Sequence, residues 1–307
     1  MNIKNGFTLN NSFVIEGPLS SRGGTASVYL ARPISKPELK AAVKFAHSDG
    51  RNVVDEDVLL RHEATLLSRS DWRHPGILRV FPIIHLNKAQ YVLRATGLED
   101  EPSFLVMEYL PGKTLSEWMD KIVKFSFDWK IEFLYQLAIC LAFIHSKGYG
   151  HRDVKPDNIL FRELPTSSFV PQPVLIDFAL ASDGKSTLSL IESSYTLEYA
   201  SPERVMQASG LIPAEFSLKP EPQDVWSFGL IVYELFTGSL PFRGNAKSIR
   251  TTLIGRSFDE RFIKDNPHLP NDIADFIRAI LKPDPDKRPS MHRIIDLLEQ
   301  KYRPPRV

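Results

Sequence analysis

Hydrophobic and polar residues alternate in short runs through the first third of the chain, and further on the hydrophobic residues recur at three- and four-residue steps. Alternation is typical of β-strands, and the longer spacing is typical of helices with one buried face. The pattern predicts strands at Phe13–Ile15, Ser27–Ala31, Leu39–Phe45, Ile77–Ile84 and Phe104–Met107, separated by turn residues.

One helix is expected among these strands, within Asp55–Arg69. The residues that repeat there at helical spacing, and so form its expected buried face, are Val58, Leu59, His62, Leu66 and Leu67. Glu63 is expected to lie beside this face.

The rest of the chain is predicted to be mainly helical. Helices are expected at Leu115–Met119, Trp129–Ser146, Asp224–Thr237, Asp272–Leu281 and Met291–Gln300. Proline- and serine-rich stretches at Leu164–Pro173 and around Pro213–Pro222 are expected to be surface loops. Because the predicted strands lie in the first third of the chain and the predicted helices lie in the rest, we expect two lobes of unequal size.

The composition narrows the classes of protein. With 307 residues, 43% of them hydrophobic, the chain can bury a full core. Lys and Arg total 38 against 37 for Asp and Glu, so neither nucleic acid nor an anionic membrane is expected as a partner. No stretch approaches the roughly 20 apolar residues that span a bilayer, and the first residues lack the apolar block of a signal peptide. We expect a cytoplasmic protein.

The single cysteine, Cys140, excludes an internal disulfide and a cysteine-based metal site. It lies in an apolar, helix-like run. We expect it to be a small core residue, with a reactive thiol as the alternative.

The run His151-Arg-Asp-Val-Lys-Pro-Asp-Asn-Ile-Leu160 holds an acid, a base and an amide within six positions. Phosphoryl transfer needs a carboxylate to orient the accepting hydroxyl, a cation to offset phosphate charge and a neutral oxygen ligand for a hard metal ion. Asp153, Lys155 and Asn158 are residues of these three kinds.

This run closely resembles the catalytic loop of eukaryotic-like (Hanks-type) protein kinases. The resemblance implies an α+β, bilobal protein kinase fold. Its N-lobe is a small antiparallel β-sheet with one regulatory helix, and its larger C-lobe is mainly helical. A single kinase domain over residues 1–307 is implied, with the N-lobe at 13–110, the hinge at 108–110 and the C-lobe at 111–302.

Val174-Leu-Ile-Asp-Phe178 is an apolar strand that ends in an acid, and the resemblance makes Asp177 the main magnesium ligand. The next residue is Ala179, where the family usually has glycine. Because alanine reaches positive φ at a cost of roughly 1 kcal/mol, we expect a stiffer hinge here rather than lost catalysis.

In Leu39–Phe45, alternation places Lys40, Ala42 and Lys44 on one face and Leu39, Ala41, Val43 and Phe45 on the other, which we expect to be core. By resemblance, Ala42 covers the adenine, and Lys44 reaches the α- and β-phosphates while it pairs with Glu63. An exposed strand lysine is the alternative for Lys44.

The loop before Val28 matches the family's phosphate-covering loop only in part. Ser21 and Ala26 take the first and third glycine places, which leaves Gly23 at the middle one and Gly24 beside it. Backbone amides can still face phosphates there, and an ordinary hairpin is the alternative.

Phe104–Leu110 resembles the family's link between lobes. Backbone groups of Glu108 and Leu110 are then expected to face adenine, with Met107 behind it. The residues expected to sandwich the base are Val28, Ala42 and Leu160. A plain buried strand is the alternative.

Three later segments resemble the peptide-binding half of the protein kinase fold: Tyr199–Glu203, Asp224–Gly229 and Asp286–Pro289. In that half, Glu203 would pair with Arg288. Lys155 and Thr196 resemble the serine/threonine branch of the family, so a serine or threonine acceptor is expected.

Hydroxyl residues crowd the segment that follows Asp177, and Arg152 precedes Asp153 directly. A phosphate on this segment would draw a charge-assisted bond from Arg152 and order the segment, as in similar kinases. The candidate regulatory residues are Ser186, Thr187, Ser189, Ser193, Ser194 and Thr196. A solvated serine-rich loop is the alternative.

The resemblance implies ATP and Mg²⁺, with Mn²⁺ as an alternative ion, a protein substrate, and a transient homodimer if the kinase phosphorylates itself in trans. The compact chain, the Tyr29-Leu-Ala31 end of the strand after the loop and the sequence Ser201-Pro-Glu203 resemble bacterial members more than animal ones. Two rivals stay open: a nucleotide-binding pseudokinase that acts as a scaffold, and a kinase of small molecules.

Overall fold

The computed structural model describes residues 2–20, 26–46, 56–85, 87–184, 196–213, 216, 218–242, 244–255, 263, 266 and 269–302. The chain divides into two compact units. The first consists of Met1–Leu110 together with Asp177–Ala179, and the second of Pro111–Ile176 together with Leu180–Val307.

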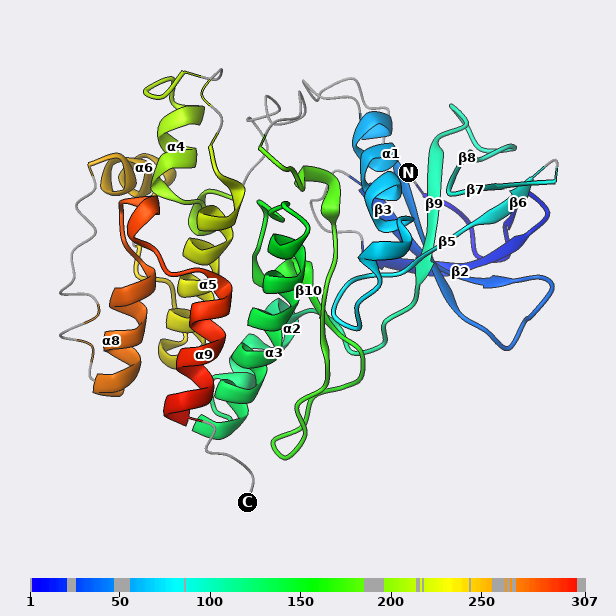
Figure 1. Ribbon diagram of the computed structural model, residues 1–307. Helices are drawn as coiled ribbons and strands as arrows, with labels where there is room; N and C mark the ends of the chain where they lie inside the picture. The colour runs from blue at the N-terminus through cyan, green and yellow to red at the C-terminus, as the bar shows by residue number, and fades with distance from the viewer. Residues whose placement is uncertain are drawn as a thin grey trace. The chain divides into compact units, whose positions relative to one another are not determined.

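In its described residues, the first unit consists of an antiparallel sheet and the helix α1 (Glu56–Leu67) (Figure 1). Its strands, in spatial order, are β1 (Thr8–Leu9), β2 (Phe13–Ser20), β3 (Ala26–Pro33), β4 (Ala41–Ala46), β9 (Ser103–Glu108) and β5 (Val80–Phe81), and β8 (Val92–Arg94) also pairs with β9. A separate hairpin joins β6 (Ile83–His85) and β7 (Lys88–Gln90). The short turn η1 (Ser70–Trp72) follows α1.

The predicted faces of β4 are largely correct. Ala41, Val43 and Phe45 belong to the buried core of the sheet. Leu39 lies before the strand and is 49% exposed, so its assignment to the core was wrong. The predicted strand Ile77–Ile84 is also wrong as one element, because it divides at Pro82, which cannot donate to a strand ladder.

The buried face of α1 differs from the predicted one. Val58 is exposed and His62 half-buried, whereas Leu60, Glu63 and Ala64 are buried. Hydrophobic periodicity placed Glu63 beside the face because it counts a carboxylate as a surface group. In the structure this carboxylate is part of the face.

The second unit is mainly helical (Figure 1). Its helices are α2 (Leu115–Ile122), α3 (Phe127–Ser146), α4 (Pro202–Ala208), α5 (Pro220–Thr237), α6 (Ala246–Ile254), α8 (Asn271–Ile280) and α9 (Met291–Tyr302). A hairpin of β10 (Ile159–Phe161) and β11 (Pro173–Leu175) and short turns η2 (Pro156–Asn158), η5 (Leu197–Tyr199) and η6 (Pro285–Lys287) complete it. Helix α3 packs against α5 and α9.

Local chemistry explains where these helices begin. Thr114 caps α2 in a reciprocal box with Glu117, and Ser126 accepts the N–H of Trp129 at the start of α3. Helix α5 starts at Pro220, so the predicted loop around Pro213–Pro222 ends earlier than expected. Proline is tolerated in a first turn because the N–H groups there have no partner within the helix.

The region Leu164–Pro173 is a loop up to β11, and α4 and α6 are additional helices that the pattern did not predict. Cys140 is fully buried in α3, and burial raises the pKa of its thiol to about 12, which confirms it as a core residue. Among the described residues, no helix combines the length and the apolar character needed to cross a membrane.

Candidate active site

Lys44, Glu63 and Asp177 meet in the first unit. Lys44 lies on β4, and its Nζ is 2.6 Å from Glu63 Oε2 on α1 and 2.9 Å from Asp177 Oδ1. The predicted pairing of Lys44 with Glu63 is therefore present. The side chain of Asp177 is 36% exposed, so this carboxylate is open to solvent while it holds the ammonium group.

Glu63 is fully buried and uses both carboxylate oxygens. Oε2 accepts from Lys44, and Oε1 accepts from the backbone N–H of Phe178 at 3.1 Å. Burial disfavours the charged form of Lys44, but the negative charges of Asp177 and Glu63 outweigh it and raise the pKa of Lys44 above its ordinary value. The ammonium group is thus charged at any physiological pH.

The backbone after β11 has a left-handed residue, but not at the position expected. Asp177 has φ 62°, whereas Ala179 lies in the short turn η3 (Phe178–Leu180) and has no positive φ. The cost expected for alanine in place of glycine therefore does not arise in this conformation. Phe178 is fully buried and contacts Trp72 edge-on at 5.7 Å between ring centroids.

Asp153, Lys155 and Asn158 meet in the second unit. Lys155 Nζ donates to Asp153 Oδ2 at 2.7 Å. Asn158 Nδ2 donates to the same Oδ2 at 2.8 Å and to the backbone oxygen of Asp153 at 2.9 Å. Because the amide nitrogen of Asn158 faces Asp153, its amide oxygen points away from that residue.

Thr196 joins this cluster through its hydroxyl group, which accepts from Lys155 Nζ at 2.7 Å and donates to Asp153 Oδ1 at 3.4 Å. The sequence analysis named Thr196 both as a match to the serine/threonine branch and as a candidate phosphorylation site. In the structure its hydroxyl lies against the catalytic-loop acid and base, 43 residues along the chain from Asp153.

Asp224 holds the backbone of the same loop. Its fully buried carboxylate accepts from the N–H of His151 at 2.7 Å and from the N–H of Arg152 at 2.8 Å, and it contacts His145 Nε2 at 3.0 Å. These bonds fix Arg152 in the left-handed region, at φ 66°. The sequence analysis named Asp224 only as the first residue of the segment Asp224–Gly229 and assigned it no role.

His151 is a second residue without a predicted role. Its Nδ1 accepts from the N–H of Asp153 at 3.4 Å, so its Nε2 carries the hydrogen and donates to the backbone oxygen of Ile176 at 2.9 Å. This buried ring therefore ties the catalytic loop to the end of the β11 segment.

The nucleotide candidates of the first unit lie on neighbouring strands. Val28 on β3 is opposite Lys44 on β4, and Ala42 on β4 is opposite Met107 on β9. The N–H of Glu108 bonds to the oxygen of Arg79, and within the described part of the chain Leu110 makes no backbone hydrogen bond. Leu160 lies on β10 of the second unit. Ser21, Gly23 and Gly24 lie outside the described residues.

The predicted pair of Glu203 and Arg288 is confirmed. It is bidentate, at 2.7 and 2.8 Å, and nearly inaccessible, since the side chains are 8% and 0% exposed. The remaining donors of Arg288 bond to the backbone oxygens of Pro222, Lys282 and Pro283. All five guanidinium hydrogens therefore have acceptors.

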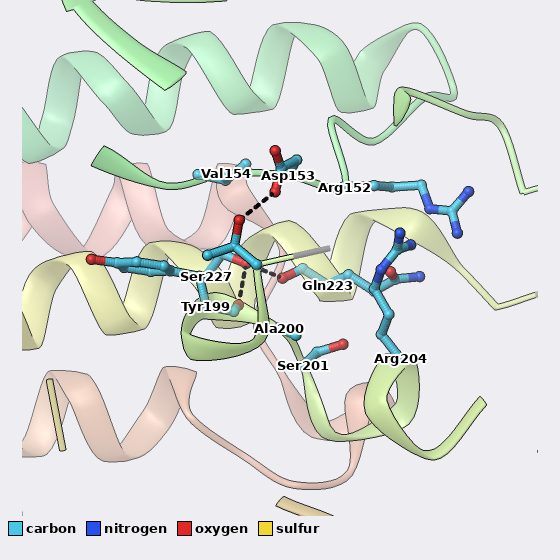
Figure 2. Close-up of a pocket in the computed structure, with 10 residues that line it drawn as sticks. Arg152, Asp153, Val154, Tyr199, Ala200, Ser201, Arg204, Gln223 and Ser227 are labelled. Carbon is cyan, nitrogen blue, oxygen red and sulfur yellow. Dashed lines mark hydrogen bonds between the residues drawn. The ribbon is translucent and has the colours of Figure 1, made fainter. Parts of the chain in front are cut away.

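Arg152 lines a small pocket with Asp153, Ser201, Arg204 and Gln223, and Figure 2 shows the guanidinium groups of Arg152 and Arg204 directed toward one another. The volume is about 10 Å³, enough for about one water molecule. Ser182 is buried, and its oxygen accepts from the N–H of Gly184. The candidates Ser186, Thr187, Ser189, Ser193 and Ser194 lie outside the described residues.

The donors present fit a hard divalent ion. Asp177 is a carboxylate with substantial exposure, and the amide oxygen of Asn158 is turned away from its neighbour Asp153. Within the described ranges no three His, Cys, Asp or Glu side chains cluster as a metal site. Carboxylate and amide oxygens suit Mg²⁺, which proteins commonly bind with one or two carboxylates and substrate phosphates.

Comparison with known families gives one extended match, to the protein kinase domain over residues 21–302. Serine/threonine-protein kinase RAD53 of Saccharomyces cerevisiae is 30% identical over 69% of this chain and 26% of its own length. A probable serine/threonine-protein kinase of Clostridium perfringens is 28% identical over 93% and 38%, respectively. Serine/threonine-protein kinase PrkC of Bacillus subtilis is 27% identical over 87% and 37%.

The chain thus spans between a quarter and two fifths of the length of these relatives. The bacterial relatives match over more of the chain than the yeast one does, which supports a Hanks-type domain of bacterial type.

Proposed function

The chain belongs to the protein kinase domain family, and from this we propose that it is a serine/threonine protein kinase that transfers the γ-phosphate of ATP to protein hydroxyls. One observation carries the proposal: the ion pair of Lys44 with Glu63 and the cluster of Asp153, Lys155 and Asn158 occur in one chain, each at hydrogen-bonding distance. We take residues 1–307 to be a single kinase domain, with a hinge at 108–110.

Asp153 is proposed to orient the accepting hydroxyl and to accept its proton. Its carboxylate is already fixed by Lys155 and Asn158, so it need not reorganise when a substrate binds. Lys155 is proposed to offset negative charge on the migrating phosphoryl group, since its ammonium group lies 2.7 Å from Oδ2 of Asp153.

Lys44 is proposed to bind the α- and β-phosphates, and Glu63 to hold Lys44 in place. The raised pKa of Lys44 keeps its positive charge available for an anionic ligand. Asp177 and Asn158 would hold Mg²⁺, with Mn²⁺ as an alternative ion. ATP bound with its metal supplies the transferable phosphoryl group and neutralises part of its charge.

The residues proposed to contact the adenine are Val28, Ala42, Met107 and Leu160. Leu110 supports this, because its backbone N–H and oxygen make no backbone bonds within the described residues. The oxygen of Glu108 is the second expected contact. Ser21, Gly23 and Gly24 are proposed to cover the phosphates.

The acceptor is proposed to be a serine or threonine of a protein. Support comes from the hydroxyl of Thr196 on Lys155 and from the buried anchor of Glu203 and Arg288, which belongs to the segment that resembles a peptide-binding half. The rivals are a pseudokinase scaffold and a kinase of small molecules, and direct assays separate them.

Regulation by phosphorylation is proposed as well, with Arg152 as the receiving cation and Ser186, Thr187, Ser189, Ser193 or Ser194 as the modified residue. Figure 2 adds Arg204 as a second guanidinium directed to the same place. A phosphate on Thr196 would instead add negative charge beside Asp153 and oppose activity. Activation in trans would require a transient homodimer, and we propose a cytoplasmic location.

Transfer of labelled γ-phosphate from Mg-ATP to the protein itself and to a generic basic protein tests the proposal. Label on serine or threonine with the wild type, and none with Asp153→Asn or Lys44→Met, is the expected result. Nucleotide binding without transfer by any form would favour the scaffold. Transfer to an amino-alcohol but to no protein would favour a small-molecule kinase.

A further inference from the structure

A cavity of about 420 Å³ lies in the second unit, away from the residues assigned above to phosphate transfer. It is open to solvent and is lined by the end of α3, the start of α5, η6 and the start of α9. Apolar walls come from Pro222, Val225, Pro285, Pro289 and Met291. Its volume falls in the range of cavities that hold small ligands, roughly 300–1,000 Å³.

One polar side chain of the lining is itself largely buried. The side chain of His145 is only 9% exposed, and its Nε2 is bonded to the carboxylate of Asp224 at 3.0 Å. In the neutral ring Nε2 therefore carries the hydrogen, and Nδ1 is a hydrogen-bond acceptor. Within the described ranges Nδ1 has no partner in the protein, so it is available to a donor in the cavity.

The charges around the cavity favour a cation. Among the residues that line the cavity, Lys219 is positive and Glu221 and Asp286 are negative. Arg288 also belongs to the lining, but its guanidinium group is closed to solvent. Two further acids, which are not in the lining, bond to lining residues: Glu203 to Arg288 and Asp224 to His145. Two cations against four acids leave a negative excess, and Lys219 is already paired with Asp286 at 2.9 Å.

Glu221 and Asp286 are the two carboxylates of the lining, and Asp286 is the one that is paired with Lys219. Glu221 lies in the first turn of α5, is half-buried, and no hydrogen bond holds it within the described residues. Arg288 does not compete for it, because all five guanidinium hydrogens are already accepted elsewhere.

We propose that this cavity binds an alkyl-guanidinium or alkyl-ammonium group, with its N–H donors on His145 Nδ1 and Glu221 and its alkyl chain against the proline and methionine walls. The shared chemistry allows two sources, a small amine or the arginine or lysine side chain of a protein partner. The site itself does not depend on the proposed kinase activity.

A chain of hydrogen bonds connects the cavity to the catalytic loop. The same His145 ring contacts Asp224, and Asp224 holds the backbone N–H groups of His151 and Arg152. A cation that donates to Nδ1 draws electron density away from Nε2, so the hydrogen on Nε2 becomes a stronger donor to Asp224. The cavity is therefore proposed as a regulatory site, and this second part does rest on the proposed kinase activity.

Binding is tested by NMR on the histidine-labelled full chain, with the His145 signal assigned as the one that is missing from the spectrum of His145→Gln. N-acetyl-arginine amide represents the small-molecule source, and a short peptide with one central arginine represents the protein source. Their citrulline counterparts keep the shape without the charge. We expect His145 to shift with one or both arginine ligands and not with citrulline.

Glu221→Gln should weaken binding by about two- to fivefold, the range of a partly exposed ion pair, while Asp296→Asn, an exposed acid elsewhere on α9, should not. No shift with either arginine ligand, equal binding of citrulline, or no effect of Glu221→Gln would overturn the site. Phosphate transfer that changes with occupancy supports regulation. Binding with unchanged transfer refutes regulation and leaves the site standing.

Discussion

The carboxylate of Asp224 accepts the backbone N–H of His151 at 2.7 Å across 73 residues of sequence. Because the second oxygen accepts the N–H of Arg152, one buried side chain determines the path of the backbone just before Asp153. The geometry of the proposed catalytic acid therefore depends on a residue of α5, at the centre of the helical unit.

Asp224→Asn should lower both stability and activity. An asparagine amide group presents its NH₂ to one of two backbone N–H donors, so one buried hydrogen bond is lost and two donors face each other. The free energy of unfolding should fall by about 1–3 kcal/mol. Chemical denaturation and phosphate transfer measure the two effects, and Asp296→Asn is the matched surface control. Unchanged activity at full folding would contradict this role of Asp224.

Arg288→Lys should destabilise the second unit although it keeps the charge. Lysine cannot replace five directed donors, so Glu203 and three backbone oxygens lose partners in a site closed to water. A loss of about 3 kcal/mol is expected from urea unfolding. The control is Lys219→Met, which removes an ion pair whose side chains are both 73% exposed, and it should leave unfolding unchanged.

The contribution of Lys44 to stability should have a characteristic pH dependence. Its pKa is raised in the folded protein, so the stabilisation is complete below the ordinary value of 10.5 and is lost as pH rises through the folded-state value. The difference in unfolding free energy between wild type and Lys44→Met should be constant from about pH 6 to 9 and shrink only in alkali. A difference that varies near neutral pH would argue against the ion pair.

Thr196 should matter through its hydroxyl group. Thr196→Ala removes both the acceptor for Lys155 and the donor to Asp153, and we expect kcat to fall by about tenfold, the equivalent of one charge-assisted hydrogen bond. Thr196→Ser should keep most of the activity, and Thr196→Val, which matches the shape, should behave like alanine. Equal rates for serine and valine variants would exclude a role for the hydroxyl.

Ala179→Gly tests the conformation of the segment after Asp177. Since Ala179 has no positive φ, glycine relieves no strain and adds freedom to the unfolded chain. Stability should stay the same or fall by about 0.5–1 kcal/mol, as thermal unfolding would show. A more stable glycine variant would mean that Ala179 is strained in the protein.

The parts of the site that were predictable from sequence are those carried by short motifs. Asp153, Lys155 and Asn158 stand within six positions, so their proximity is a local property, and strand alternation located Lys44. The pairs of Lys44 with Glu63 and Glu203 with Arg288 were expected by resemblance alone, because no periodicity links residues so far apart.

The errors share a physical cause. Helical periodicity misplaced the face of α1 because Glu63 is buried by its ion pair and not by hydrophobicity. The role of Asp224 was missed because it is defined by a long-range contact with the catalytic loop. Thr196 was linked to Lys155 only by resemblance, because that contact is also long-range. Pro82 follows the last residue of β5, whereas Pro220 is the first residue of α5. The effect of a proline therefore depends on whether its position would otherwise donate a backbone hydrogen bond.

The burial of Cys140 makes the chain a ready background for site-specific labelling. Its thiol is inaccessible and its pKa is raised to about 12, so at neutral pH it offers no thiolate to an alkylating probe. A cysteine introduced on the surface, for example by Asp296→Cys, would carry a fluorophore or spin label alone, with the native cysteine left in place. With one such cysteine on each unit, the distance between the two labels would report how the two units move relative to one another in solution.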